Sequence, residues 1–266
     1  MILKKLKSAG FTFKKGLGQN FIVDEGFLSS VVGEFGLSKD DIVVEVGTGA
    51  GTLTRVIAPL VKNVITFEVD ERLKPILAEQ FNGFDNIELR FIDALSRDAK
   101  MPDVPYKVVA NVPYYITTPL LLKFISDPNC VEVCVLVQEE LGMRIVAKLS
   151  TKDYGALSIA MQAWGNFRIV RKVGRGMFVP PPNVDSAFVQ GIRGEGELFD
   201  SRANGFLKGL FANRRKTIEN GLCAVLGCGR EDVRKILADI GINVSLRPEN
   251  LSVEDFKKLI VRIRQN

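Results

Sequence analysis

The chain has 266 residues, of which 46% are hydrophobic and 25% are charged, a composition typical of a globular protein with a sizeable core. No apolar stretch reaches the roughly 20 residues that a membrane span needs, and residues 1–15 contain no apolar segment of signal-peptide length. A disordered chain and an integral membrane protein are therefore excluded, and we expect a cytoplasmic protein.

Net charge is +5, but the charge is unevenly distributed along the chain. Residues 1–23 contain five lysines and no acid, residues 24–190 contain 17 basic and 21 acidic side chains, and residues 191–266 contain 14 basic and 10 acidic ones. Basic ends around a mildly acidic middle favour a polyanionic partner such as nucleic acid, although such surfaces also arise for solubility alone.

The content of histidine and cysteine limits the chemistry. Histidine is absent, and the four cysteines form two widely separated pairs without CxxC spacing (Cys130, Cys134, Cys223 and Cys228). We therefore expect no metal site and buried free thiols. Catalysis must use carboxylates, lysine, tyrosine or a cofactor that is already activated.

A polar segment with two glycines and two amides, KKGLGQNF at residues 14–21, precedes the first helical pattern at 27–35, for which Asp24 is the expected N-cap. This composition suits a flexible lid over a small-molecule pocket. A disordered basic arm is the alternative interpretation.

The next segment has the order strand, glycine loop, helix, which opens a doubly wound α/β unit. The strand covers residues 41–46, the loop is GTGAG at 47–51, and the helix covers 52–60. A second strand at 64–67 ends in Glu68, whose carboxylate can accept hydrogen bonds from both hydroxyls of a ribose. These features fit a nicotinamide cofactor and S-adenosylmethionine equally well.

The loop spacing separates these two cofactors. The loop reads GxGxG with Glu45 two residues before its first glycine, whereas pyrophosphate is bound by GxGxxG. After a helix near 72–81, a third strand at 87–92 ends in Asp93, which can accept the exocyclic amine of an adenine beside an apolar wall that includes Ala94. The alternative role of Asp93 is a helix cap. S-adenosylmethionine, which has no phosphate, is the favoured cofactor.

The fourth strand, at 106–110, ends in Asn111-Val112-Pro113-Tyr114. Reacting groups lie at the carboxyl ends of strands in an open parallel sheet. Asn111 offers a carbonyl and an amide, Pro113 is expected to leave its carbonyl free, and Tyr114 offers a flat ring. These groups suit a planar amine, although an ordinary exit from strand to turn has the same residue types.

Further elements follow in two groups. We expect a strand at 131–137, helices at 139–148 and 154–164, and strands at 167–173 and 184–192. The loop between the last two strands combines basic residues with Phe178, a combination that suits binding of a flipped nucleotide. A glycine-rich linker at 191–197 precedes four helical patterns at 199–211, 215–226, 230–240 and 253–263. The sequence predicts two domains, one at 1–193 with a basic N-terminal arm and a helical one at 194–266 whose basic residues are expected to contact phosphate.

The motifs together resemble those of the KsgA family, the ribosomal RNA adenine N6-dimethyltransferases. They are GLGQNF at 16–21, EVGTGAG at 45–51, Glu68, Asp93, NVPYYITTPLL at 111–121, VQEELGMRIVAK at 137–148, YGALSIAMQAW at 154–164, FVPPPNVDSAFV at 178–189 and LFANRRKTIENGL at 210–222. The resemblance implies a Rossmann-like S-adenosylmethionine methyltransferase sheet with helices on both faces and a small all-α C-terminal domain. It implies that the domain at 1–193 is the catalytic domain and that the domain at 194–266 is an RNA-binding domain. It also implies methylation of N6 on two adjacent adenosines in a 3′-terminal hairpin of small-subunit (16S) rRNA, within a pre-30S particle, by a monomer without a metal.

The resemblance also assigns roles to residues. Asn111 becomes the central catalytic residue between the donor methyl group and the target amine, with the Pro113 carbonyl as a second acceptor, and Tyr114 and Phe178 stack on the two faces of the target adenine. The expected cofactor-binding residues are Gln19, Asn20, Phe21, Glu45, Gly47, Gly49, Gly51, Glu68, Val69, Asp93, Ala94 and Asn111. The expected RNA-binding residues are Lys14, Lys15, Arg144, Lys148, Arg175, Arg214, Arg215 and Lys216, with solvated surface charge as the alternative.

Val112 and Tyr115 stand where the commonest form of the family's motif has leucine and asparagine, and neither is expected to reach the reacting atoms. Two other functions remain open. One is a resistance methyltransferase acting on large-subunit rRNA, against which the RRKT helix and the FVPPPNVDSA loop argue. The other is a nucleic-acid-binding factor that keeps the fold without turnover.

Overall fold

The computed structural model describes residues 2–8, 10–195 and 199–265. The chain forms two compact units, one made of Met1–Gly142 with Arg168–Arg193 and the other of Met143–Phe167 with Gly194–Asn266. We expected residues 143–167 in the first domain, and in the structure they belong to the second unit.

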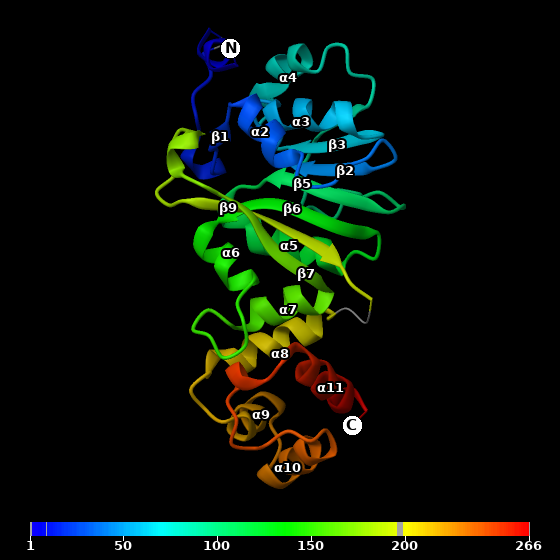
Figure 1. Ribbon diagram of the computed structural model, residues 1–266, viewed down its shortest axis with the longest axis vertical. Coiled ribbons are helices and arrows are strands. Elements are labelled where there is room, and N and C mark those ends of the chain that lie inside the picture. The colour runs from blue at the N-terminus through cyan, green and yellow to red at the C-terminus, as the bar shows by residue number, and fades with distance from the viewer. Residues whose placement is uncertain (1, 9, 196–198, 266) are drawn as a thin grey trace. The chain divides into compact units, whose positions relative to one another are not determined.

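A seven-stranded sheet in the order β4-β3-β2-β5-β6-β9-β7 is the centre of the first unit (Figure 1). Its strands are β2 (Ile42–Val46), β3 (Asn63–Glu68), β4 (Ile87–Phe91), β5 (Tyr106–Asn111), β6 (Cys130–Gln138), β7 (Gly165–Val173) and β9 (Ser186–Arg193). Neighbouring strands from β4 to β6 pair in parallel, and β9 pairs antiparallel with β6. The strands β5 and β6 are largely apolar and mostly buried, with Lys107 and Glu132 as charged exceptions, as is typical of central strands covered on both faces.

Helices cover both faces of this sheet, as expected (Figure 1). On one side lie α2 (Glu25–Val32), α3 (Thr52–Ile57) and α4 (Lys74–Gln80), and on the other lies α5 (Thr117–Ser126), while α6 (Glu139–Ile145) follows β6. Val31 of α2 and Ile57 of α3 pack with Val43, Val109 and Phe188 of the strands in one buried cluster. The predicted α/β fold class is confirmed.

Besides α5, two further features of the first unit were not predicted. The N-terminal segment contains α1 (Ile2–Ser8), and a small second sheet joins β1 (Phe21–Ile22) to β8 (Phe178–Val179), with Ile22 opposite Phe178. Short 3-10 turns complete the chain at η1 (Lys15–Leu17), η2 (Ala58–Leu60), η3 (Glu71–Leu73), η4 (Tyr114–Ile116), η5 (Arg175–Met177) and η6 (Pro248–Asn250). Two-residue strands leave too little periodicity for a sequence pattern to reveal.

The second unit is helical. It contains α7 (Ala156–Trp164), α8 (Ser201–Ala212), α9 (Ile218–Leu226), α10 (Arg230–Asp239) and α11 (Val253–Arg264), and the last four match the four predicted helices. Ile159 of α7 is buried with Leu207, Leu222 and Phe256 of the C-terminal helices, which is why the segment around α7 belongs to this unit. Within the described ranges, every helix is too short or too polar to cross a membrane.

Candidate active site

A cavity opens at the carboxyl edge of the sheet in the first unit. Its lining comes from five segments, at residues 17–22 and 28, 45–50 with 52–53, 67–69, 92–94 and 111–116. Four of these segments follow or end the neighbouring strands β2, β3, β4 and β5, whose carboxyl ends meet at one edge because the strands are parallel. All predicted cofactor residues except Gly51 line this cavity.

Positive φ angles shape the glycine loop after β2. Gly49 has a φ of 55°, and a Cβ atom there would lie 2.9 Å from the ring of Phe21. Gly51 differs from our prediction, because it lies outside the cavity lining. Gly51 is the N-cap of α3 with a φ of 78°, and a Cβ atom at this position would lie 2.9 Å from the ring of Phe81. Gly51 is therefore a helix-packing glycine, while Gly49 allows the backbone to line the cavity.

Glu45 is a buried carboxyl on β2 with two hydroxyl partners. Only 1% of the residue is exposed, and its Oε2 accepts hydrogen bonds from Thr54 Oγ1 at 2.6 Å and Thr66 Oγ1 at 2.8 Å. Burial raises the pKa of Glu45 to about 8, since desolvation disfavours the charged form. A cation in the cavity would favour ionisation of this carboxyl.

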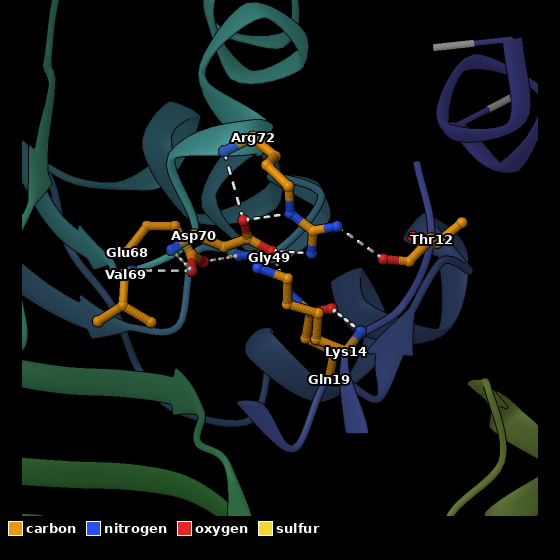
Figure 2. Close-up of polar contacts among 8 residues, drawn as sticks. All are labelled: Thr12, Lys14, Gln19, Gly49, Glu68, Val69, Asp70 and Arg72. Carbon is orange, nitrogen blue, oxygen red and sulfur yellow. Dashed lines mark hydrogen bonds and ion pairs between the residues drawn. The ribbon is translucent and has the colours of Figure 1, made fainter. Parts of the chain in front are cut away.

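Glu68 ends β3, and the backbone fixes its side chain (Figure 2). Its Oε2 accepts a hydrogen bond from Gly49 N at 2.8 Å, and its Oε1 accepts bonds from Val69 N and Asp70 N at 2.9 Å each. Burial raises the pKa of Glu68 above its ordinary value. Because Oε2 accepts only one of these bonds, it keeps acceptor capacity toward the cavity.

Asp93 follows β4 and forms a turn, with its Oδ1 accepting a hydrogen bond from Leu95 N at 2.8 Å. The residue is exposed and lines the cavity beside buried Ala94, so the turn leaves its other oxygen available to a ligand. Lys123 Nζ donates to the Ala94 carbonyl at 2.6 Å and anchors this turn to α5. Local capping and a ligand-binding role are therefore compatible at Asp93.

The loop after β5 presents a side-chain oxygen to the cavity. Asn111 Nδ2 donates to the Asn20 carbonyl at 3.0 Å, which leaves Asn111 Oδ1 as the acceptor at the cavity edge. Our prediction of a free Pro113 carbonyl is wrong, because this oxygen accepts bonds from Ile116 N at 3.1 Å and Thr117 Oγ1 at 3.2 Å. These bonds hold η4 and the start of α5.

Val112 supplies the free backbone carbonyl instead. It lines the cavity, and no described residue donates a hydrogen bond to its carbonyl oxygen. Sequence reasoning missed it because any residue type can offer a main-chain oxygen, so only the fold shows which carbonyl of the loop is left without a donor.

The aromatic residues of the predicted clamp have different environments. Tyr114 lines the cavity, and its hydroxyl shares a hydrogen bond of 2.6 Å with Ser186 Oγ. Phe178 lies outside the cavity lining, is 2% exposed, and packs in the core cluster with Ile22. In this conformation Phe178 presents no ring face to a base. Tyr115, which we did not expect at the site, lines the cavity mouth and is 61% exposed.

Other lining residues missed by sequence reasoning include Gly18, Thr48 and Ile92. Ile92 immediately precedes Asp93, and Gly18 and Thr48 lie inside motifs that we singled out, so proximity in sequence was an available signal. The lining contains the carboxyl groups of Glu45, Glu68 and Asp93, but no lysine or arginine among its described residues. This charge pattern disfavours a phosphate and favours a cationic ligand.

The predicted RNA-binding residues are mostly exposed, and their role remains a prediction. Lys14, Arg144, Lys148, Arg175, Arg215 and Lys216 are exposed, while the side chain of Lys15 lies outside the described part of the chain. Arg214 instead pairs with Glu249, with 2.6 Å between Nη2 and Oε2, and donates to the Lys152 carbonyl. Arg214 therefore supports the fold of the second unit.

The cysteines are free thiols, as expected. Cys130 and Cys134 are buried as predicted, whereas the prediction of burial is wrong for Cys223 and Cys228, which are partly exposed. Among the described residues, no group of three or more histidine, cysteine, aspartate or glutamate side chains could hold a metal ion.

An open, mostly parallel sheet, a carboxyl-lined cavity at its edge and an Asn-Val-Pro-Tyr loop beside that cavity define the class of protein, an α/β methyltransferase acting on a planar amine. Residues 10–265 match the family model described as ribosomal RNA adenine dimethylase. The chain belongs to this family and is a ribosomal RNA adenine dimethyltransferase.

Relatives and solved structures agree with this assignment. Proteins named ribosomal RNA small subunit methyltransferase A are 40% identical to the chain in Streptococcus equi subsp. zooepidemicus, covering 96% of this chain and 93% of that protein, and in Streptococcus mutans serotype c, covering 98% and 94%. A dimethyladenosine transferase structure from Plasmodium falciparum gives a TM-score of 0.81 at 26% identity, covering 92% of this chain and 98% of that chain. The structure of 23S rRNA methyltransferase ErmE gives 0.70 at 27% identity, covering 92% and 100%.

Proposed function

We propose that this protein transfers methyl groups from S-adenosylmethionine to N6 of two adjacent adenosines in a 3′-terminal hairpin of small-subunit rRNA within a pre-30S particle, acting as a monomer in the cytoplasm. The observation that carries the proposal is the pair of acceptor oxygens, Asn111 Oδ1 and the Val112 carbonyl, at the edge of a cavity lined by carboxyl groups. The names of the relatives support the choice of the small subunit.

The cavity fits the proposed cofactor. Glu45 suits the cofactor's ammonium group, Glu68 the ribose hydroxyls, and Asp93 with Ala94 the adenine ring and its amine. A nicotinamide dinucleotide fits less well, because the described lining offers no cationic side chain to a pyrophosphate. When bound, S-adenosylmethionine supplies a methyl group already activated by its sulfonium.

The chain's own task is to prepare the amine. The N6 lone pair of adenine is delocalised into the ring, so N6 is a poor nucleophile. Asn111 Oδ1 and the Val112 carbonyl can accept the two N6 hydrogens, which draws the nitrogen toward tetrahedral geometry and orients its lone pair. The alkylated amine is strongly acidic, so its proton can pass to solvent without a histidine base.

The aromatic residues hold the base. Tyr114, fixed by its hydrogen bond to Ser186, offers one ring to the target adenine. Phe178 would have to leave the core to offer another, whereas Tyr115 is already exposed at the cavity mouth. Tyr115 is therefore proposed as the second aromatic contact. Four exposed cations of the second unit, Arg144, Lys148, Arg215 and Lys216, are proposed to contact phosphates, together with Lys14 and Arg175 of the first unit.

The test uses S-adenosylmethionine with a labelled methyl group and ribosomal subunits that lack the modification. We expect label only in the small subunit, at two neighbouring adenosines near the 3′ end of its rRNA. Large subunits and protein-free rRNA, assayed in parallel, report the substrate that the enzyme recognises. Label confined to the large subunit would overturn the assignment in favour of a resistance-type methyltransferase.

A further inference from the structure

Asp70 is a buried carboxylate just beyond β3 that the mechanism does not use. Only 4% of the residue is exposed. Arg72 donates to it through Nε at 2.8 Å and through Nη2 at 2.5 Å, and Gln19 donates through Nε2 at 2.7 Å (Figure 2). These donors hold the pKa of Asp70 below its usual value, with the hydrogen bonds from Arg72 as the largest cause. Asp70 thus joins the sheet edge to the N-terminal segment.

Further contacts from the same group reach the N-terminal segment. Arg72 Nη1 donates to the Thr12 carbonyl at 3.1 Å, and its guanidinium lies 4.8 Å from the centroid of the Phe11 ring. Gln19 Oε1 accepts a hydrogen bond from Lys14 N at 2.8 Å, so both ends of this amide are engaged. Figure 2 shows Asp70 and Arg72 on one side and Thr12, Lys14 and Gln19 on the other. Residues 11–19 are thereby fastened to the turn after β3.

The fastened segment leads directly into the cavity wall. Residues 17–21 line the cavity, whereas Asp70 and Arg72 do not. The backbone N–H of Asp70 also donates to Glu68 Oε1 at 2.9 Å, and Glu68 is the proposed ribose acceptor. Asp70 therefore connects two parts of the cofactor cavity without touching its interior.

We infer that Asp70 and Arg72 are positioning residues that hold residues 11–19 against the sheet edge, so that residues 17–21 close over the bound cofactor and slow its release. This inference rests on the proposed function only in that the cavity must bind S-adenosylmethionine. The pair sets cofactor affinity and residence time, and it takes no part in preparing the amine.

The principal experiment compares Asp70→Asn with the wild-type protein. Asparagine keeps the size of the side chain but loses the charge and one acceptor oxygen, so the bonds from Arg72 and Gln19 weaken together. We expect the Kd for S-adenosylmethionine to rise about tenfold, mostly through faster dissociation, because hydrogen bonds to a charged partner are lost. The kcat at saturating cofactor and the KM for rRNA should stay near wild-type values.

Two further variants separate positioning from stability. Glu219 is a largely buried carboxylate in the second unit, and its Oε1 lies 2.5 Å from Nε of Arg234. Glu219→Gln neutralises this carboxylate and is therefore a matched control for the loss of an ion pair with arginine. It should lower thermal stability and leave cofactor kinetics unchanged. Arg72→Ala removes the same contacts from a more exposed position and serves if Asp70→Asn folds poorly. The two substitutions combined should raise the Kd for the cofactor little more than Asp70→Asn alone, because they disrupt one shared interaction.

A readout on the N-terminal segment completes the test. Trypsin cleavage after exposed Lys14 should be faster in Asp70→Asn than in wild type or Glu219→Gln, and added S-adenosylmethionine should protect the wild type most strongly. Unchanged cofactor dissociation and unchanged cleavage in both Asp70→Asn and Arg72→Ala would overturn the inference. A wild-type protein that does not bind S-adenosylmethionine would instead contradict the proposed cofactor.

Discussion

The carboxyl of Glu45 is a buried acid whose charge depends on the contents of the cavity. Burial raises its pKa, and the nearby Glu68 carboxyl acts in the same direction. The two threonine hydroxyls that donate to Glu45 lower its pKa but do not offset its desolvation. Without a cation in the cavity, folding the ionised form is costly, and a ligand carrying an ammonium group changes that balance.

This acid predicts a pH dependence of stability. Because the pKa of Glu45 is about 8 in the folded protein and near its ordinary 4.5 when unfolded, the folded state holds a proton that the unfolded state has already released between these values. Its contribution to stability is complete below about pH 4.5 and is lost as the pH rises through about 8. The loss is on the order of a few kcal/mol.

Glu45→Gln should remove this part of the pH dependence, because an amide of the same shape cannot ionise. Measured as Tm from pH 5 to 9 without cofactor, the variant should become more stable relative to wild type as the pH rises. Glu88→Gln, at a side chain that is half exposed, should follow the wild-type curve and serves as the control. Parallel curves for Glu45→Gln and wild type would contradict the prediction.

The position of Asn111 predicts that its substitution lowers kcat far more than it weakens cofactor binding. Asn111→Ala removes the side-chain acceptor for the N6 hydrogens, so kcat should fall by about two to three orders of magnitude, as for the loss of one aligned polar group in other active sites. The hydrogen bond to the Asn20 carbonyl is also lost, and a small change in cofactor Kd is therefore expected. Single-turnover methylation of small subunits measures the first effect and calorimetry the second. Substantial turnover in the variant would rule out the proposed role.

At the scale of elements, the glycine loop shows how one short segment serves two purposes. Gly49 faces the cavity, whereas Gly51 faces the interior, where Leu77 and Phe81 pack close to it. Both adopt positive φ, so conformation alone does not distinguish them. Gly51 is the N-cap of α3, and its close contact with Leu77 brings the start of α3 against α4.

Gly51→Ala should therefore destabilise the protein without abolishing cofactor binding. A Cβ atom at this position would lie 3.1 Å from Leu77 Cδ2 and 2.9 Å from the Phe81 ring, and Leu77 is completely buried. Gly83→Ala is the matched control, because its φ of 88° carries the same conformational cost while no atom of the described residues lies within 4 Å of the added one. Denaturant unfolding should show Gly51→Ala to be less stable than Gly83→Ala by about 1–3 kcal/mol. Equal losses would show that packing contributes nothing.

Sequence patterns predicted the seven strands of the main sheet, most of the helices and the strand ends that line the cavity, because these depend on local periodicity and on parallel topology. They did not distinguish the Val112 carbonyl from that of Pro113, since hydrogen bonds from η4 and α5 decide which oxygen is free. Helix α5 was not predicted either, because its apolar run directly continues a motif that we read as a loop. The hydrogen bond from Gln19 to Asp70 joins residues that are 51 positions apart in sequence, and no local sequence pattern indicates such a contact.

At the scale of the whole molecule, the second unit is discontinuous in sequence. Helix α7 supplies Ile159 and Ala163 to a core otherwise built from the C-terminal helices, and Tyr154 donates from its hydroxyl to the Leu251 carbonyl at 3.0 Å. A boundary at residue 193 alone would separate these partners. The exposed cations Arg215 and Lys216 precede α9 on this jointly built unit, so their position depends on both parts of the chain.

The paired substitution Arg215→Ala with Lys216→Ala should weaken RNA binding mainly through electrostatics. Each lost phosphate contact reduces the magnitude of the slope of log K against log salt by about 0.7–0.9, so the magnitude should fall by about 1.4–1.8 for the pair. The control is Lys62→Ala with Lys100→Ala, which removes the same charge from two exposed positions in the first unit. Lys62 directly precedes β3 and therefore lies at the end of that strand opposite the cavity. That control should leave the slope nearly unchanged. Binding of an unmodified small-subunit rRNA fragment at several salt concentrations measures both, and an equal change in the two double variants would show that net charge alone attracts the RNA.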